Sequence, residues 1–279
     1  MLERVEHDNG VVTYASPRLR AAAVVHAFST RIGGISEGPY ASLNLGSLAK
    51  GDEGDSNVAV AENFRRLRAA LGREQARRVI VRQVHGGAVW RAPAAPLRPE
   101  EAPEADAIVS TEPAHLLTVR VADCVPVLLA SRGGAVVAAV HAGWRGLVAG
   151  VIGQAVGQLA QMVDVGELVA AVGPHIGAAH FEVGPEVVQA FEHAGLGEAV
   201  REHVGGKAHV DMLEAALMQL EAGGVRRDQV DFDAGLCTFE RVGEFFSHRR
   251  DAGATGRMAA VISPGCGRFR EAASGGRRL

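Results

Sequence analysis

The sequence has few cysteines, no dominant charge and no long hydrophobic run. Three cysteines in 279 residues (Cys124, Cys237 and Cys266) are too few for a disulfide framework, so we expect reduced thiols and a cytoplasmic location. The net charge of −3 provides no broad basic surface, which argues against a nucleic-acid partner. The start, MLERVEHDNG, lacks the apolar core of a signal peptide, and no uncharged apolar run reaches about 18 residues, so no membrane partner is expected.

Several familiar motifs are also missing. The sequence has no GxGxxG followed by its acidic partner, no GxxxxGK[ST], no HExxH and no GxSxG. None of its eleven histidines forms an HxH pair. A domain that assembles several copper ions draws on clustered histidines, so we discount a multicopper centre.

Short apolar runs and amphipathic patterns are mixed without a clean βαβ alternation. Helices are predicted from Asp55 or Ser56 to Leu71, over residues 146–163, and in PEVVQAFEHAG and VDMLEAALMQLEAGG. Strands are predicted between them, and the last ones are assigned to QVDFDAGLCT and EFFSHRRDAGATGRMAAVIS. With no repeat and no boundary, the pattern predicts one α+β domain over residues 1–279, with mixed sheets and helices outside. The tail, residues 264–279, has no apolar pattern and is expected to fray.

The most informative stretch runs from Val121 to Gly146. Cys124 precedes the apolar run VPVLLA, a Gly-Gly turn follows, and a second run, AVVAAV, leads to His141. Two apolar runs joined in this way predict a buried hairpin or two neighbouring strands, which would bring a thiol and an imidazole to one sheet edge. AGWRG and a helical pattern follow at once, and a helix start offers free N–H donors to an anion.

His85, Cys124 and His141 share one feature, because each adjoins or interrupts an apolar strand pattern beside Gly or Asp. A thiolate with two imidazoles is a ligand set that zinc accepts, with a fourth position open for water. Their spacing differs from that of a zinc finger or ribbon. Taken singly, each is also explained as a hydrogen-bonded buried polar group or a small core thiol.

Two carboxylates and several arginines are further candidates. Asp123 and Asp106 lie in apolar surroundings and must be paired; each is a candidate for orienting a metal-bound His, for acid–base catalysis, or for capping backbone N–H groups. Arg31 opens a loop rich in Gly, Ser and Asn, and Arg145 precedes a predicted helix, so both are candidates for binding an anion. A surface salt bridge is the alternative for each arginine.

The motifs FSTRIGGISEGPYASLNLG, VRQVHG, ADAIVS, VADCVPVLLA, AAVHAGWRG, GPHIGAAHFEVG and FFSHRRDAGATGR together resemble the YfiH-like family over roughly residues 24–263. That family is also labelled polyphenol oxidase, laccase-domain and purine nucleoside phosphorylase. The resemblance implies a single α+β domain with mixed sheets sandwiched between helices. It also implies a His–Cys–His zinc site, which falls on His85, Cys124 and His141. At His175, His180 and His248 the chain departs from residues common in relatives, which puts fine specificity in doubt.

The family implies a zinc-dependent enzyme that uses phosphate to cleave adenosine, inosine and 5′-methylthioadenosine, and that deaminates adenosine. In this interpretation Arg31 or Arg145 binds phosphate, Asp123 or Asp106 moves protons, and Asn44 and Gln83 contact the substrate. The alternatives are a Cys–His hydrolase with Cys124 as nucleophile, a copper-dependent polyphenol oxidoreductase, and a non-catalytic protein with structural zinc. His85 discriminates between the first alternative and the zinc site, since a Cys–His dyad does not need it. Protein partners are not predicted.

Overall fold

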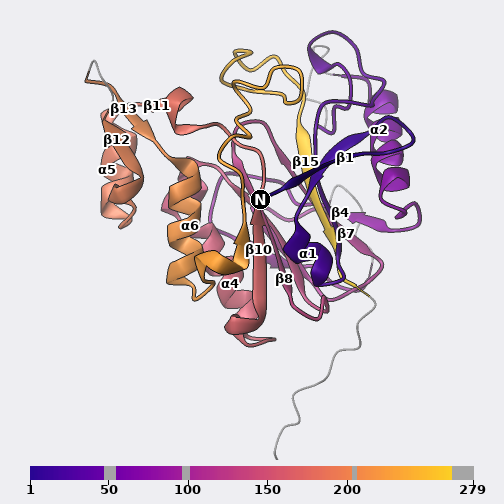
Figure 1. Ribbon diagram of the computed structural model, residues 1–279, viewed down its shortest axis with the longest axis horizontal. Coiled ribbons are helices and arrows are strands. Elements are labelled where there is room, and N and C mark those ends of the chain that lie inside the picture. The colour runs from indigo at the N-terminus through magenta and orange to yellow at the C-terminus, as the bar shows by residue number, and fades with distance from the viewer. Residues whose placement is uncertain (47–54, 96–100, 203–205, 266–279) are drawn as a thin grey trace, which may run out of the picture.

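The computed structural model describes residues 1–46, 55–95, 101–202 and 206–265, and within them two six-stranded sheets pack face to face (Figure 1). The first sheet has the strand order β1 (Glu3–Glu6), β2 (Val12–Ala15), β3 (Val25–Ser29), β15 (Met258–Ser263), β7 (His115–Val121), β4 (Arg77–Val79). The second has the order β14 (Val230–Asp231), β10 (Leu168–Val172), β8 (Val125–Ser131), β9 (Val137–Ala142), β6 (Ala107–Ser110), β5 (Val89–Arg91).

Both sheets are mixed. The pairs β4/β7, β5/β6 and β10/β14 are parallel, and the other neighbours within these two sheets are antiparallel. A small antiparallel sheet is formed by β11 (Glu182–Val183), β13 (Ala208–Val210) and β12 (Val200–Glu202). In Figure 1 it lies away from the two large sheets, next to α5.

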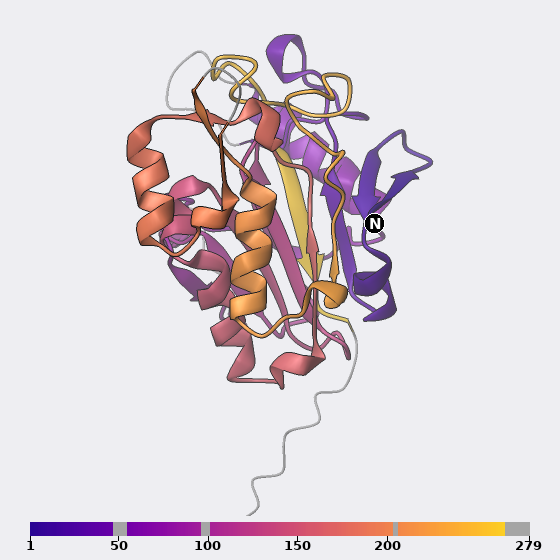
Figure 2. The same cartoon turned by 60° about the vertical axis from the view of Figure 1, so that its left-hand side comes forward.

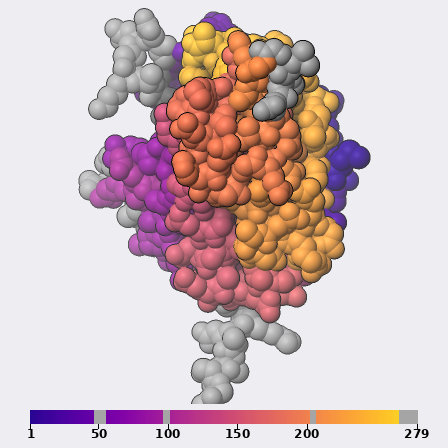
Figure 3. Space-filling view, turned by 90° about the vertical axis from the view of Figure 1, so that its left-hand side faces the viewer, coloured from indigo at the N-terminus to yellow at the C-terminus, as the bar shows by residue number. Residues whose placement is uncertain are grey.

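Helices cover the outer faces of the two sheets. The first sheet is covered by α2 (Asn57–Ala70), which begins at Ser56, whose side chain accepts a hydrogen bond from the Val58 N–H. The second is covered by α4 (Val151–Ala160) and α6 (Met212–Ala222), with α5 (Pro185–His193) beside them (Figure 2). Figure 3 faces this covered side, where α5 and α6 form a closed surface. Shorter elements are α1 (Pro17–Ala21), α3 (Trp144–Val148) and 3₁₀ turns at Gly38–Tyr40, Val165–Glu167, Ala178–His180, Gly197–Ala199 and Arg227–Gln229.

The core follows from side-chain alternation along the central strands. In β8, Val127 and Leu129 pack against the helices, whereas Leu128 and Ala130 pack between the two sheets. Successive strand side chains point to opposite faces, so a strand buried on both faces carries a continuous apolar run. This explains why VPVLLA and AVVAAV lack polar alternation, and in β8 and β9 the polar residues Ser131 and His141 lie at or next to the strand ends.

The α+β class with sheets between helices is therefore confirmed, but two element assignments were wrong. The helix over residues 146–163 is two helices, α3 and α4, because Gly150 adopts a left-handed φ of +75° between them. Residues 244–257 form loops rather than strand, and the Arg250 guanidinium donates to the carbonyls of Thr238, Phe239 and Phe245 there.

The predicted frayed tail lies outside the described residues from residue 266 onward. None of the helices that the structure describes combines the length and apolarity needed to cross a bilayer.

Candidate metal centre and active site

Three side chains that the sequence singled out converge at one end of the central strands of the second sheet. One ligand atom from each of His85, Cys124 and His141 lies within 4.8 Å of the others. The two imidazole rings meet edge to face, with centroids 4.8 Å apart. In a tetrahedral zinc site, ligand atoms lie about 3.3–3.6 Å apart, since the bonds are about 2.0–2.3 Å long. The donor set and its spacing fit a zinc ion with small closure of the side chains.

The hairpin predicted from the sequence places two of the ligands. Strands β8 and β9 pair antiparallel with Pro126 opposite His141, and Cys124 immediately precedes β8. The start of one strand therefore lies beside the end of the next, which brings the thiol to the imidazole. His85 arrives separately, on the loop between β4 and β5, with a left-handed φ of +60°. A non-glycine residue in this region is uncommon and is found at sites that constrain the backbone.

Asp106 connects these two parts of the site. It is fully buried, and one carboxylate oxygen accepts a 2.8 Å hydrogen bond from His141 Nδ1. The carboxylate also accepts from the backbone N–H groups of Val84, His85 and Gly86. Although burial alone would raise it, the pKa of Asp106 is lowered by the hydrogen bonds from His141 and the backbone. With Nδ1 engaged, His141 presents Nε2 to the ligand cluster.

The same surroundings favour the thiolate of Cys124. Burial would raise the pKa of the thiol, but the neighbouring imidazoles of His141 and His85 lower it to about 6. The thiolate is the form that binds a metal. A glycine is required beside it, because a Cβ at Gly143 would lie 2.7 Å from His85 Cδ2 and 3.2 Å from Cys124 Sγ.

Asp123 lies next to Cys124 but is turned away from the ligands. Its two oxygens accept hydrogen bonds from Thr238 Oγ1, at 2.6 Å, and from the Arg249 backbone N–H, at 2.7 Å. Its φ of +84° is left-handed, so these bonds hold a strained residue in place. Asp123 thereby ties the loop before β8 to two loops of the C-terminal part of the chain.

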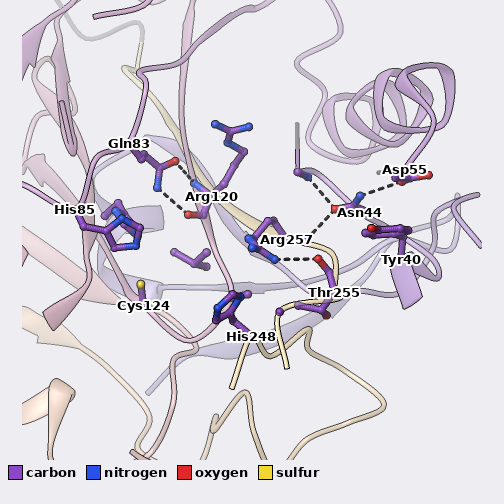
Figure 4. A pocket seen from close by; sticks show the side chains of 15 residues that line it. Tyr40, Asn44, Asp55, Gln83, His85, Arg120, Cys124, His248, Thr255 and Arg257 are labelled. Carbon is purple, nitrogen blue, oxygen red and sulfur yellow. Dashed lines mark hydrogen bonds between the residues drawn. The ribbon is translucent and has the colours of Figure 1, made fainter. Parts of the chain in front are cut away.

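A cavity of about 480 Å³ opens next to the ligand set. Figure 4 shows His85 and Cys124 at one end and Tyr40, Asn44 and Asp55 at the other. The size is that of small-molecule sites, which typically occupy about 300–1,000 Å³. Two arginines lie between the ends in the same view, Arg120 and Arg257, and His248 and Thr255 also line the cavity.

Among the described residues, no carboxylate pairs with either of these two arginines. The Arg120 guanidinium donates no hydrogen bond within this part of the chain, whereas Arg257 donates to the carbonyls of Thr255 and Gly256. Burial lowers the pKa of both guanidinium groups. The positive charge of Arg257 lowers the pKa of Arg120 further. Two half-buried cations that lack a carboxylate partner among the described residues make this cavity a candidate site for an anion.

The predicted substrate-binding residues Asn44 and Gln83 both line this cavity. Their amides are engaged by the chain itself: Gln83 exchanges two hydrogen bonds with the Arg120 backbone, and Asn44 accepts from the N–H groups of Gly46 and Arg257. These bonds place the backbone around both arginines.

Arg31 and Arg145 are not among the residues that line the cavity. Arg31 donates to the carbonyls of Ala41 and Val242 and stacks on the Phe246 ring, 4.5 Å from its centroid. Arg145 is exposed and stacks on Trp144. The Arg31 side chain therefore links the segment at Ala41 to the segment at Val242. The sequence does contain a signal for Arg120, because an arginine interrupts the otherwise apolar end of the run that forms the buried strand β7.

The fold and site define a two-sheet α+β protein with a His–Cys–His ligand set beside a cationic cavity. A family model described as "Multi-copper polyphenol oxidoreductase laccase" matches residues 25–264, and the chain belongs to this family. Its homologues include the "Purine nucleoside phosphorylase" of Deinococcus radiodurans, 45% identical over 255 residues (88% of this chain, 92% of the relative). The "Purine nucleoside phosphorylase YfiH" of Escherichia coli is 42% identical over 236 residues, 84% of this chain and 91% of the relative.

Solved structures agree on the fold. The crystal structure of YlmD from Geobacillus stearothermophilus has a TM-score of 0.82 at 30% identity, covering 94% of this chain and 98% of that one. That of the Bacillus licheniformis hypothetical protein YfiH has a TM-score of 0.82 at 25% identity, covering 92% and 97%. The resemblance to the YfiH-like family is therefore confirmed.

Proposed function

We propose that this chain is a zinc-dependent purine nucleoside phosphorylase, acting on adenosine, inosine and 5′-methylthioadenosine, and that it also deaminates adenosine. The observation that carries the proposal is that the ligand set and two arginines without a carboxylate partner line one cavity. Relatives named purine nucleoside phosphorylase support the reaction class.

His85, Cys124 and His141 would hold the zinc ion. One thiolate and two imidazoles match its preference, and three protein ligands leave a position open, as in catalytic rather than structural sites. When bound, the ion supplies Lewis-acid polarisation of an oxygen held beside it. Asp106 fixes the His141 ring through Nδ1, so we assign it positioning rather than proton transfer.

Phosphate is the anion that suits the two arginines. A guanidinium offers a planar fork of donors and keeps its charge when half-buried, which matches phosphate oxygens. We therefore move the phosphate role from Arg31 and Arg145, which face elsewhere, to Arg120 and Arg257. The nucleoside would lie along the cavity between the ligand set and Tyr40, bounded by Asn44 and Gln83.

In phosphorolysis, phosphate attacks the anomeric carbon as the glycosidic bond breaks, and the base leaves with a proton. Holding the dianion beside that carbon turns a two-body encounter into a positioned reaction. Asp123 has both oxygens engaged by Thr238 and Arg249, so we assign it to holding the loop of Cys124.

The alternatives have less support from the site. A Cys–His hydrolase needs only Cys124 and His141, yet His85 joins them within 4.8 Å. Multicopper oxidation draws on clustered histidines, and the sequence has no HxH pair. A structural zinc site is closed by four protein ligands, whereas this set of three faces a cavity.

The experiment is to assay base release from adenosine, inosine and 5′-methylthioadenosine with and without phosphate, on protein of known metal content. We expect phosphate-dependent release of base and a ribose 1-phosphate by the zinc form. Oxidation of a phenol dye at a comparable rate by the copper form, with no phosphate-dependent release, contradicts the proposal.

A further inference from the structure

A second group of metal-binding side chains lies outside the cavity. One ring nitrogen of His180, Cys237 Sγ and a carboxylate oxygen of Glu240 lie within 4.8 Å of one another, and none of the three residues lines the cavity. His180 is the last residue of a 3₁₀ turn, and the other two come from the loop that follows β14. Their chemistry is that of a transition-metal site: one thiol, one imidazole and one carboxylate.

The local structure directs these groups toward one point. The His180 ring stacks on Phe239, with centroids 4.4 Å apart and planes 13° from parallel, so its orientation is set by packing. Nε2 lies 2.8 Å from a Glu240 oxygen. Cys237 is 3% exposed, and its sulfur accepts a 3.2 Å hydrogen bond from the Gly177 N–H, which fixes the position of the sulfur.

An ion pair between His180 and Glu240 explains only part of this arrangement. Their side chains are 29% and 56% exposed, and an exposed pair contributes little to stability. The pair alone gives no reason for a buried sulfur at the same point. A metal ion would use all three donors after the nitrogen and oxygen separate by about 0.5 Å, to the roughly 3.3 Å expected around zinc.

We propose that His180, Cys237 and Glu240 form a second site for a divalent transition-metal ion such as zinc, with the exposed side open to water. Binding displaces the Cys237 thiol proton to solvent, and the thiolate, imidazole and carboxylate then coordinate the ion. The site joins the segment Ala178–His180 to residues 237–240, two parts of the chain held in contact by the bond from the Thr238 N–H to the His175 carbonyl.

The second site is connected to the first through a hydrogen bond between Thr238 and Asp123, each of which is next in sequence to a proposed ligand. Thr238 follows Cys237 and donates to Asp123, and Asp123 precedes Cys124. An ion held at the second site would therefore fix the loop that supports a ligand of the first. Its role would be to stabilise this loop from outside the cavity, separate from the reacting centre.

The test uses cobalt(II) as a probe, because a thiolate ligand gives cobalt a sulfur-to-metal charge-transfer band. In the full-length chain carrying Cys124→Ser and Cys266→Ser, Cys237 is the only thiol left. We expect one cobalt per chain, a thiolate band, and a rise in Tm with metal. Adding His180→Ala or Glu240→Gln should weaken the affinity at least about tenfold, since loss of even an outer partner costs that much.

A matched control is His193→Ala, an exposed histidine at the end of α5, which should leave the affinity unchanged. The wild-type chain gives an independent measurement that does not depend on folding of the cysteine variants. It should take up two zinc ions at saturation, and His180→Ala should take up one. Saturation of the wild type at one ion, or a cobalt affinity unchanged by His180→Ala, overturns the proposal.

Discussion

Replacing Arg120 or Arg257 by alanine should remove phosphate binding while leaving the metal centre intact. Both line the cavity with the ligand set, and neither has a carboxylate partner in the described part of the chain. Losing a charge-assisted hydrogen bond costs about 1.5–3 kcal/mol. That corresponds to a loss of roughly ten- to a hundredfold in kcat/KM for phosphorolysis.

The structure also ranks the two arginines. The Arg257 Nη1 group already donates to the carbonyls of Thr255 and Gly256, so part of its donor set is committed. The Arg120 guanidinium donates no hydrogen bond within the described residues, so it has more N–H groups than Arg257 to offer phosphate. We expect Arg120→Ala to fall toward the hundredfold end and Arg257→Ala toward the tenfold end.

The assay compares phosphorolysis with deamination of adenosine by the same proteins. Water, not phosphate, attacks in deamination, so a phosphate-binding arginine should affect that rate far less. The KM for phosphate should rise, and phosphate should no longer raise the Tm. Arg120→Lys keeps the charge but loses the planar fork, and it should recover only part of the activity.

Two variants serve as controls. Arg145→Ala removes an exposed guanidinium outside the cavity and should leave phosphate binding unchanged. Arg31→Ala removes bonds to Ala41 and Val242 and should lower Tm rather than phosphate affinity. The reasoning is refuted if Arg120→Ala and Arg257→Ala keep the wild-type KM for phosphate while Arg31→Ala or Arg145→Ala loses it.

Four further predictions concern the metal centre and stability. Purified protein should hold about one zinc per chain at the first site, and His85→Ala or Cys124→Ala should strip it; metal analysis showing full zinc in His85→Ala would mean that the ligand assignment is wrong. Iodoacetamide should alkylate Cys124 slowly until a chelator is added, because the metal shields the thiolate, and fast labelling of untreated protein would instead favour a nucleophile. Asp106→Asn should weaken zinc affinity about 10- to 100-fold in a chelator competition, since His141 loses its charged partner; an unchanged affinity would remove the positioning role. Burial lowers the pKa of His26 to about 4, below the 6.5 of an unfolded chain. The buried neutral imidazole therefore contributes about 3 kcal/mol to stability above pH 6.5, and this contribution is lost as the pH falls toward 4. The free energy of unfolding in urea should depend less on pH in His26→Gln than in the wild type.

The convergence of Cys124 and His141 could be predicted from the sequence because strand pairing is local. Cys124 and His141 bracket two apolar runs joined by a short turn, so the hairpin brings them together in any register close to the observed one. The fold class followed from the same runs. Asp106 was singled out as a buried carboxylate, but its four hydrogen bonds depend on contacts that spacing does not reveal.

The proposed anion site could not be predicted in the same way. Arg31 and Arg145 stood out because they flank a loop and a helix start, which are local features. Arg120 and Arg257 lie on strand β7 and just before β15, and only the pairing of these strands brings them to one cavity. The strand predicted over EFFSHRRDAGATGRMAAVIS is present only at Met258–Ser263, because residues 244–257 are held as loops by contacts to Arg250 that residue spacing does not reveal.

The bonds of Asp106 have a consequence for how the proposed metal centre would gain and lose an ion. The fully buried carboxylate of Asp106 accepts hydrogen bonds from the backbone N–H groups of residues 84–86, which hold the loop that carries His85. It also accepts a hydrogen bond from Nδ1 of His141, which holds that ring. The conformational entropy of ordering these groups is therefore lost when the chain folds, not when an ion arrives. A chelated protein should keep its ligands in place and reload quickly, as a preorganised receptor does.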